Sequence, residues 1–396
     1  MQKATAQQLK EHNQRLVLRA IYTGQASSRA AIAEKTGLTR PTISQIVGEL
    51  LEAGLVQEEG PGESRGGKPP TILSFTDDAY QITGLHLGGH RTFGAVTDLR
   101  GRILARAARP TDRTDTESVL AGLDLVLDDL RAQATRPLLG IGVSVPGLVD
   151  PSNDIVRYTA YLNWRNVPLG ERLAAHCGGD VPIYLDNDTN LAALGEQVFG
   201  AGDGIANMVI VMVGVAGIGA GIVINGEIYH GATGGAGEIG HMPVADGNVS
   251  CVCGRRGCLE AVASGWALVR RAREAAAAYP ESALNTLAPD DITFEDVRQM
   301  VEAGDPTAVA LAQEAGRYLG LVVAILASTV NPQRVIIGGS VSELGEPLFD
   351  SLQRTFSEHT LSILAEETEI LPANLGTDVN ILGAVAQVLK SELGVL

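Results

Sequence analysis

The chain has 396 residues, a formal net charge of −16 and 47 glycines, while aromatic residues make up only 4% of it. This length predicts two or three domains with full cores, and the composition is that of a globular protein rich in tight turns. The acidic balance excludes a body that binds nucleic acid over its whole surface.

The charge is unevenly distributed along the chain. Residues 1–72 hold nine Lys and Arg against seven Asp and Glu, a net of +2, whereas the remainder carries −18. Within the first 48 residues seven basic residues stand against two acidic ones. A small basic module therefore precedes an acidic body.

The basic module is predicted to form three short helices. An apolar stripe through Val17, Ala20 and Ile21 predicts a helix over 15–23, and Gly24 ends it. Ser28 is suited to cap a second helix over 29–36. Thr39 is suited to cap a third helix that begins at residue 40, with a proline in its first turn.

Helices in this arrangement, with a glycine-containing turn before the third, are typical of a helix-turn-helix module, whose recognition helix enters the major groove of DNA. Strand-like segments at 54–57 and 71–73 predict a wing around the loop between them. We therefore expect residues 1–75 to form a winged helix-turn-helix domain; a helical module used for protein docking is the alternative. The candidate DNA-binding residues are Arg29, Thr39, Arg40, Thr42, Ser44, Gln45, Arg65 and Lys68.

From Gln81 onward, strand-like segments alternate with helical ones, which predicts an α/β body. The segments ITGLHLG, FGAVTDLRG and RILARAA predict a strand meander, a helix over about 117–133 predicts a crossover, and LLGIGVSV predicts the next strand. A second series, IYLDND, NMVIVMVGVAGIGAGIVING and RVIIGGS, follows. Glycine-rich turns after two of these strands favour close approach of backbone amides to an anionic or polyhydroxyl ligand.

The most apolar segment, 208–224, runs for 17 residues without a polar side chain. That is shorter than the roughly 20 residues a membrane span needs, and its glycines and β-branched residues favour two buried strands. The N-terminus lacks the apolar core of a signal peptide. We expect a cytoplasmic protein without a membrane segment.

One imidazole and three of the four cysteines lie within a short window: His241, Cys251, Cys253 and Cys258. This is the Cys3His set that a tetrahedral structural zinc ion takes, and four protein ligands leave no open position for water. A disulfide or free buried thiols are the alternatives, and an intracellular compartment disfavours the disulfide. Cys177, outside the window, is interpreted as a small buried hydrophobic residue.

Several motifs occur in order along the chain: SRAAIAEKTGLTRPTIS and GGKPP in the first module, then HLGGHR, GVSVPGLVD, LDNDTNLAALGE, GIGAGIVINGEIYHGATGGAGEIGHM and CVCGRRGCLEAVASG. Together they resemble the repressor branch of the ROK family of sugar kinases and sugar-responsive repressors. The resemblance implies an actin-like, ribonuclease H-like body over 80–396. Its first lobe would comprise about 80–185 plus a final helix over 381–393, and its second lobe about 186–380.

The resemblance also implies a sugar site. The matching residues are Asn187, Asp188, Glu238, His241 and Glu260, with Asp188 at the position of the kinases' general base. Carboxylates and an amide hold adjacent sugar hydroxyls well in a dry cleft. His241 would serve twice, with one ring nitrogen on zinc and the other on a hydroxyl. Capping of a helix or loop is the alternative role for Asp188 and Glu238.

Two departures from the kinase pattern argue against catalysis. Where the kinases carry a phosphate-loop Asp, this chain has His86, so the carboxylate that directs Mg²⁺ is missing. The Thr of the second phosphate loop is replaced by Ala216, which removes a hydroxyl donor. Asp188 is then a sugar ligand that no longer takes a proton.

The prediction is a repressor that binds operator DNA and senses a sugar or sugar phosphate, as a homodimer or homotetramer with one structural zinc per chain. The first alternative is an ATP-dependent sugar kinase that carries a DNA-binding module. The second is a repressor controlled by a partner protein, with the sugar site vestigial.

Overall fold

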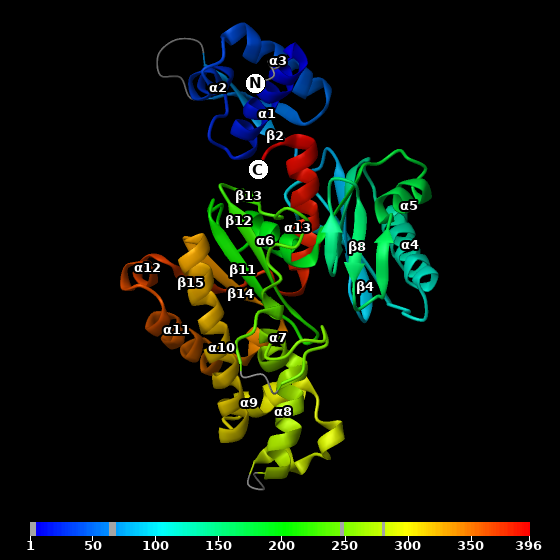
Figure 1. The fold of residues 1–396 in the computed structure, drawn as a ribbon. Coiled ribbons are helices and arrows are strands. Elements are labelled where there is room, and N and C mark those ends of the chain that lie inside the picture. Colours follow the sequence, from blue (N-terminus) through cyan, green and yellow to red (C-terminus); the bar gives the residue numbers. More distant parts are fainter. Residues whose placement is uncertain (1–4, 63–68, 246–248, 279–281) are drawn as a thin grey trace. The chain divides into compact units, whose positions relative to one another are not determined.

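The structure is a computed structural model that describes residues 5–62, 69–245, 249–278 and 282–396 (Figure 1). Its internal contacts divide the chain into two compact units. Unit 1 comprises residues 1–186 and 381–396, and unit 2 comprises residues 187–380.

The N-terminal module of unit 1 consists of α1 (Ala6–Tyr22), α2 (Arg29–Thr36), α3 (Arg40–Glu52) and a hairpin of β1 (Val56–Pro61) and β2 (Thr71–Phe75). Ser28 and Thr39 cap α2 and α3 through their side chains, as expected. Helix α1 begins well before the predicted start, because Thr5 and Gln8 form a reciprocal capping box. The early turns of α1 are largely exposed, so no apolar periodicity marks them.

The strands of the hairpin pair antiparallel, with Val56 opposite Phe75. Ile32, Ile43 and Val47 are fully buried and form the centre of the module. The wing predicted from the sequence is therefore present. Its candidate residues Arg65 and Lys68 lie outside the described residues.

A five-stranded sheet in the order β10-β6-β3-β4-β5 forms the centre of the unit 1 body. Strands β3, β4 and β5 run as an antiparallel meander, and β6 lies parallel to β3 after the crossover helix α4, as expected. The buried leucines of α4 pack into the core of this unit, which decides the crossover position. The bounds are β3 (Gln81–Leu87), β4 (Arg91–Thr97), β5 (Ile103–Pro110), α4 (Thr116–Gln133), β6 (Leu138–Val145) and β10 (Ile183–Asn187).

The C-terminal segment forms helix α13 (Val379–Val388), which continues as a π-helix over Leu389–Leu393 (Figure 1). Helix α13 packs on the five-stranded sheet of unit 1. Glycines in the sheet permit this close approach. A Cβ at Gly142 would lie 2.2 Å from the carbonyl oxygen of Ala384, and one at Gly84 would lie 2.6 Å from that of Ile381. Any larger residue at Gly142 would push the helix off the sheet.

A small sheet that sequence periodicity did not predict also belongs to unit 1. It joins β7 (Leu148–Asp150), β8 (Ile155–Thr159) and β9 (Trp164–Val167) antiparallel, before helix α5 (Leu169–His176). Trp164 is only 1% exposed and packs in the same core as α4. The strands are too short for a periodic pattern, and one buried indole anchors them.

Unit 2 contains a second five-stranded sheet in the order β13-β12-β11-β14-β15. Its strands are β11 (Met208–Val213), β12 (Ile218–Ile224), β13 (Glu227–Ile228), β14 (Arg334–Gly338) and β15 (Glu369–Pro372). Strand β11 is parallel to β14 and antiparallel to β12. The apolar segment 208–224 thus forms two strands, as predicted.

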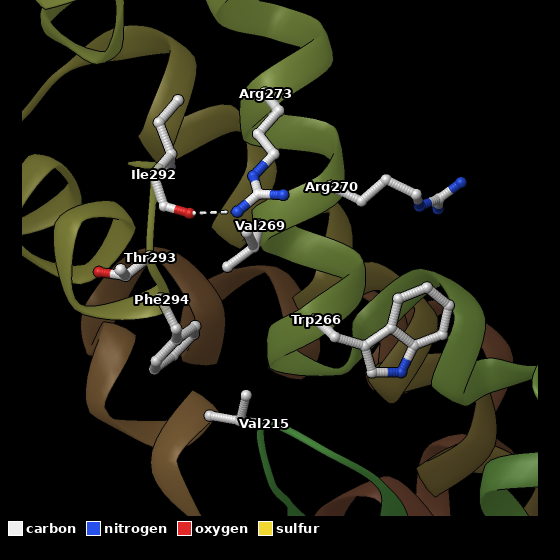
Figure 2. A pocket seen from close by; sticks show the side chains of 8 residues that line it. All are labelled: Val215, Trp266, Val269, Arg270, Arg273, Ile292, Thr293 and Phe294. Atoms are coloured by element: carbon white, nitrogen blue, oxygen red, sulfur yellow. Dashed lines mark hydrogen bonds between the residues drawn. The ribbon is translucent and has the colours of Figure 1, made fainter. Parts of the chain in front are cut away.

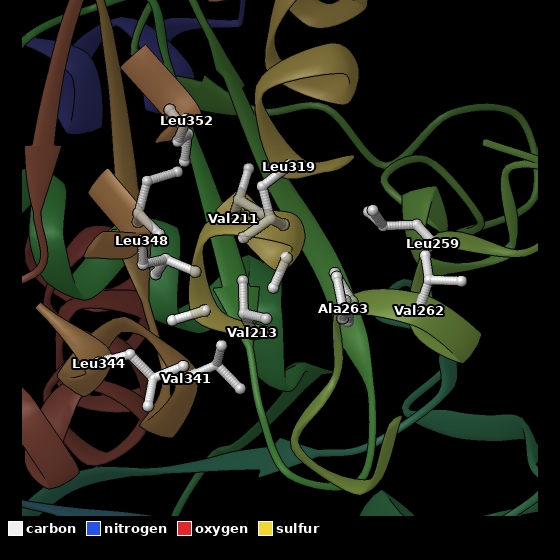
Figure 3. Packing of buried hydrophobic residues seen from close by; sticks show 14 of the residues in the cluster. Val211, Val213, Leu259, Val262, Ala263, Leu319, Val341, Leu344, Leu348 and Leu352 are labelled. Carbon is white, nitrogen blue, oxygen red and sulfur yellow. The ribbon is translucent and has the colours of Figure 1, made fainter. Parts of the chain in front are cut away.

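The alternation along β11 separates the two faces of this sheet. Val209, Val211 and Val213 belong to the larger core, whereas Met208 and Ile210 contact alanines of α6 (Asp188–Phe199) on the other face. Figure 3 shows Val211 and Val213 beside Leu319 of α10. The helices contributing to the larger core are α7 (Leu259–Ala263), α8 (Gly265–Ala278), α9 (Phe294–Glu302), α10 (Pro306–Val330), α11 (Glu346–His359) and α12 (Ser362–Glu367).

Helix α10 is long and apolar enough to cross a membrane by length and composition alone, and it is the one such helix among the described residues. More than half of its most apolar window, 56%, is buried inside the unit. Gly316 and Gly320 let the backbone of α11 approach it closely. These contacts are those of a core helix.

Candidate functional site

The junction of β10 and α6 places two of the candidate sugar ligands. Asn187 ends the strand and caps the helix, because its Oδ1 accepts hydrogen bonds from the N–H groups of Thr189 and Asn190 at 2.8 and 3.1 Å. Asp188 is the first helical residue, and its Oδ1 accepts from Thr189 N–H at 2.9 Å. The Oδ1 atoms of Asn187 and Asp188 are therefore used in capping α6. A sugar contact by Asn187 would come from its Nδ2.

Glu238, His241 and Glu260 of unit 2 are close enough for their charges to affect one another. Burial, together with the nearby charge of Glu238, raises the pKa of Asp188 to about 6. Burial also raises the pKa values of Glu238 and Glu260, and both are partly offset by His241. Carboxylates with raised pKa values are typical of binding and catalytic sites.

Glycines bring the second group of candidate sugar ligands close to the sheet. Gly237 has a φ of +90°, and a Cβ there would lie 1.8 Å from the carbonyl oxygen of Ala220. The Ala220 N–H in turn donates to the Gly237 carbonyl at 2.8 Å. Part of the glycine string therefore serves contact between backbone segments, which positions Glu238 and His241, and not only the approach of a ligand.

The cluster of His241, Cys251, Cys253 and Cys258 assembles as the sequence spacing indicates. One ligand atom from each of these residues lies within 4.8 Å of the others. Cys253 Sγ and Cys258 Sγ are 3.8 Å apart, and Cys251 Sγ lies 3.7 Å from His241 Nδ1. Tetrahedral coordination with metal–sulfur bonds of about 2.3 Å requires separations of this size. These residues could hold a metal ion.

The metal-ligand cluster adjoins the carboxylates. Cys251 Sγ lies 3.8 Å from Glu260 Oε1, and His241 contributes to both groups. His241 directs Nδ1 toward Cys251, so Nε2 is the nitrogen that a sugar hydroxyl would meet. A metal here would fix the ring orientation of a candidate sugar ligand.

The two positions that depart from the kinase pattern are also defined. His86 Nδ1 lies 3.0 Å from Ser144 Oγ in unit 1, and burial lowers the pKa of the imidazole to about 4. At neutral pH this side chain is uncharged and supplies no carboxylate. In unit 2, Ala216 lies in the turn between β11 and β12, where Gly214 N–H donates to the Gly217 carbonyl at 2.9 Å.

This turn borders a cavity of about 440 Å³ (Figure 2). Its walls are apolar apart from two arginines and one threonine, and the eight described lining residues include no carboxylate. Arg273 is held by the backbone carbonyls of Asp290 and Ile292 at 2.8 and 3.0 Å. The cavity thus lacks a carboxylate of its own for a magnesium ion. Its lining residues are Val215, Trp266, Val269, Arg270, Arg273, Ile292, Thr293 and Phe294.

In the winged-helix module, Arg40, Ser44 and Gln45 are exposed on the first turns of α3, with Thr42 half-buried beside them. The Thr39 hydroxyl caps the helix and contacts the Thr42 hydroxyl at 2.9 Å. These positions suit a recognition helix, and their contacts with DNA stay a prediction.

Two contacts modify the predicted DNA-binding surface. Arg29 pairs with Glu58 of β1 at 2.9 Å, which ties its charge to the hairpin. Lys10 of α1, which sequence analysis did not single out, pairs with Glu49 at 2.8 Å. Lys10 also lines a cavity of about 270 Å³ together with Gln45, so α1 extends the surface of the recognition helix. Apolar periodicity does not mark the exposed early turns of α1, so it gave no indication of Lys10.

Gln45→Ala is expected to relax sequence preference at one base pair of each half-site, because a glutamine in the major groove reads a base edge at about 1–3 kcal/mol. Binding to a panel of single-base operator variants measures this directly. Gln313→Ala, at an exposed position of α10, is the matched control. An unchanged preference profile for Gln45→Ala would remove this residue from the readout.

A winged-helix module ahead of an α/β body with two five-stranded sheets defines the class: a DNA-binding protein built on an actin-like body. The model of the ROK family matches residues 82–391, and that of the MarR family matches residues 11–66. The chain belongs to the ROK family. The family and fold predicted from the sequence motifs are confirmed.

The relatives of this chain include both transcriptional repressors and sugar kinases. The xylose repressor of Bacillus subtilis (strain 168) is 32% identical over 394 residues, covering 98% of this chain and 97% of that protein. A glucokinase of Halalkalibacterium halodurans is 35% identical over 308 residues, 76% of this chain and 92% of the enzyme. A crystal structure of a ROK family transcriptional regulator, a homolog of the E. coli MLC protein, superposes with a TM-score of 0.87 at 28% identity, covering 98% of both chains.

Proposed function

We propose that the chain is a sugar-responsive transcriptional repressor that binds operator DNA through α3 and the wing. One observation carries the proposal: a winged-helix module and a group of carboxylates with raised pKa values, among them Asp188 and Glu238, occur in one chain. A repressor relative that matches 98% of the chain supports it. A kinase relative matches 76% of the chain.

In this proposal the effector is a sugar or a sugar phosphate. Asp188, Glu238 and Glu260 accept hydrogen bonds from hydroxyls, while Asn187 Nδ2 and His241 Nε2 supply donors. Sugar binding shifts a population between two arrangements of the protein, and this requires different affinities of the sugar for the two. The repressor acts in the cytoplasm. It is a homodimer or homotetramer, because an operator with two half-sites is bound by two DNA-binding modules from two chains.

We infer that the metal is zinc and that its role is structural. Three thiolates and an imidazole are the ligands that zinc prefers, and the separations of the ligand atoms suit its tetrahedral geometry. The four ligands leave no position for a reacting water. Zinc would hold the loop so that His241 keeps its orientation toward the sugar.

The test is operator binding in the presence of D-xylose, D-glucose, N-acetyl-D-glucosamine and the 6-phosphates of the two hexoses. We expect one of these compounds to change the operator Kd by about tenfold or more, the usual size of an allosteric coupling. Identical operator affinity with every compound would leave the effector proposal without support. DNA binding itself should weaken steeply with salt, as phosphate contacts release counterions.

The second candidate is a sugar kinase, favoured by the retained Asp188 and by the glucokinase relative. We expect no sugar-dependent release of ADP from ATP and Mg²⁺, because neutral His86 cannot anchor the metal and Ala216 lacks the hydroxyl. A coupled assay with an active ROK glucokinase as positive control measures this. ADP release that requires both a sugar and Asp188 would favour the kinase.

A further inference from the structure

Arg100 connects the body of unit 1 to the end of the first DNA-module helix. It lies in the turn between β4 and β5, and its Nη1 donates a hydrogen bond to the backbone carbonyl of Tyr22, the last residue of α1, at 2.9 Å. Its Nε donates to Asp77 Oδ1 at 2.8 Å. The Tyr22 hydroxyl returns a hydrogen bond to the carbonyl of Leu99 at 3.1 Å. The turn and the helix end are thus bonded in both directions.

The same guanidinium packs on two aromatic rings of the module. Its carbon lies 4.0 Å from the centroid of Tyr22 and 5.1 Å from that of Phe75, the last residue of β2. The two rings meet edge to face at 4.9 Å. Arg100 therefore holds the end of α1 and the end of the wing hairpin together.

The chemistry explains why an arginine occupies this position. The carbonyl of Tyr22 belongs to the last turn of α1, where carbonyl groups have no partner within the helix. A cation at a helix C-terminus is also favoured by the helix dipole. The planar guanidinium of Arg100 can meet the carbonyl, the carboxylate of Asp77 and the rings at once, which the ammonium of a lysine cannot do.

A second anchor joins α1 to the C-terminal segment. Arg15 Nη2 donates to the carbonyl of Ser391 in the π-helix at 3.1 Å. Gly394 ends that π-helix with a φ of +60°, and a Cβ there would lie 2.5 Å from Arg15 Cδ. The Tyr184 hydroxyl of β10 donates to the carboxylate of Glu392 in the same turn.

The helix that bears this second anchor starts beside a candidate sugar ligand. Asn380, in the first turn of α13, donates from Nδ2 to the backbone carbonyl of Asp188 at 2.7 Å. The helix then continues to the π-helix that Arg15 contacts. Helix α13 thus begins at the Asp188 backbone and continues along the chain into the segment that Arg15 contacts.

We propose that Arg100 is a positioning residue that fastens the DNA-binding module to the body, so that α1 moves with the first lobe when the sugar binds. Without this fastening, the module keeps the segment 76–80, the Tyr22–Leu99 hydrogen bond and the Arg15 anchor, but it loses the contact that joins the end of α1 and the end of β2 to the body. The coupling part of the proposal rests on the proposed function; the fastening itself does not.

The first test needs no sugar. Full-length Arg100→Ala is compared with Arg102→Ala, which removes an arginine from the same turn. The Arg102 side chain pairs with Asp98 and makes no hydrogen bond to α1 in the part of the chain that the structure describes. We expect amide hydrogen exchange in residues 17–22 to become about tenfold faster in Arg100→Ala and to stay unchanged in Arg102→Ala. Equal exchange in the two variants would overturn the fastening.

The second test uses the same variants with D-xylose and the other sugars named above. Arg100→Ala is expected to retain operator affinity within about threefold while losing most of the sugar-induced change in Kd. Arg100→Lys, which keeps the charge at the helix end, should restore part of it. Normal coupling in Arg100→Ala would overturn the proposal. A wild-type protein that responds to no sugar would contradict the proposed function instead, while the exchange experiment still decides the fastening.

Discussion

Asn in place of Asp188 is expected to stabilise the sugar-free protein at pH 7.5 and to abolish its response to sugar. The folded-state pKa of Asp188 is raised from 3.8 to about 6 by burial, so ionisation of this group costs stability. The cost is absent below pH 4 and complete above pH 6. Full conversion of the shift would give about 3 kcal/mol, and the partial exposure of Asp188 to solvent reduces this to about 1–2 kcal/mol.

Denaturant unfolding between pH 4 and pH 8 measures the effect. The difference in unfolding free energy between Asp188→Asn and wild type should grow as the pH rises through this range and vanish near pH 4. Asp180→Asn, the same change at an exposed position before β10, is the matched control. A variant that loses stability equally at all pH values would contradict the assignment of a destabilising charge.

The same variant should require at least about tenfold more sugar to change operator binding, since a lost charge-assisted hydrogen bond to a hydroxyl costs about 1.5–3 kcal/mol. A titration of operator affinity against sugar concentration measures the loss. Stability gained together with response lost would separate a functional carboxylate from one that only caps α6. An unchanged response would leave Asp188 with the capping role alone.

Cys258→Ser is expected to remove the bound metal and to lower both stability and sugar response. Cys258 is 1% exposed, and its Sγ lies 3.6 Å from the carbonyl oxygen of His241. The substitution therefore removes the most deeply buried of the three thiol ligands. Metal binding contributes directly to folding free energy, and we expect a loss of at least several kcal/mol from the loop that the metal holds. His241 should then lose its fixed orientation.

Elemental analysis of purified protein should find about one zinc per chain in the wild type and little in Cys258→Ser, as a four-ligand site requires. Thermal unfolding with and without a chelator gives the stability change. Cys177→Ala is the matched control, because Cys177 is buried in unit 1 and takes no part in the cluster. Wild-type protein that contains no metal would refute the site.

Local chemistry made much of the first module predictable. Ser28 and Thr39 cap helices that begin at the next residue, and a cap involves only neighbours in the chain. Helix α1 was placed too late, because its early turns are exposed and apolar periodicity marks only buried faces. The capping box at Thr5 and Gln8 was the local signal that would have located its start.

The long helix α10 of unit 2 was not predicted from apolar periodicity. Residues 306–330 are apolar on most sides of α10, because α10 lies in the largest core and contacts several helices. A helix buried on most sides shows no amphipathic stripe. The burial of Glu196 was also not predictable from the sequence. This residue is 0% exposed and accepts hydrogen bonds from the backbone N–H groups of Asn374 and Leu375, which lie far from it in the sequence.

The sequence itself predicted the metal-ligand cluster and the DNA-binding module, because the residues of each are close in the chain and their types and spacing form a recognisable pattern. The carboxylates at 188, 238 and 260 had no such spacing, and only family resemblance grouped them. Tertiary structure decides their raised pKa values, since burial exists only after folding. It also decides the contact of Arg100 with Tyr22, which joins residues 78 positions apart that no local pattern could pair.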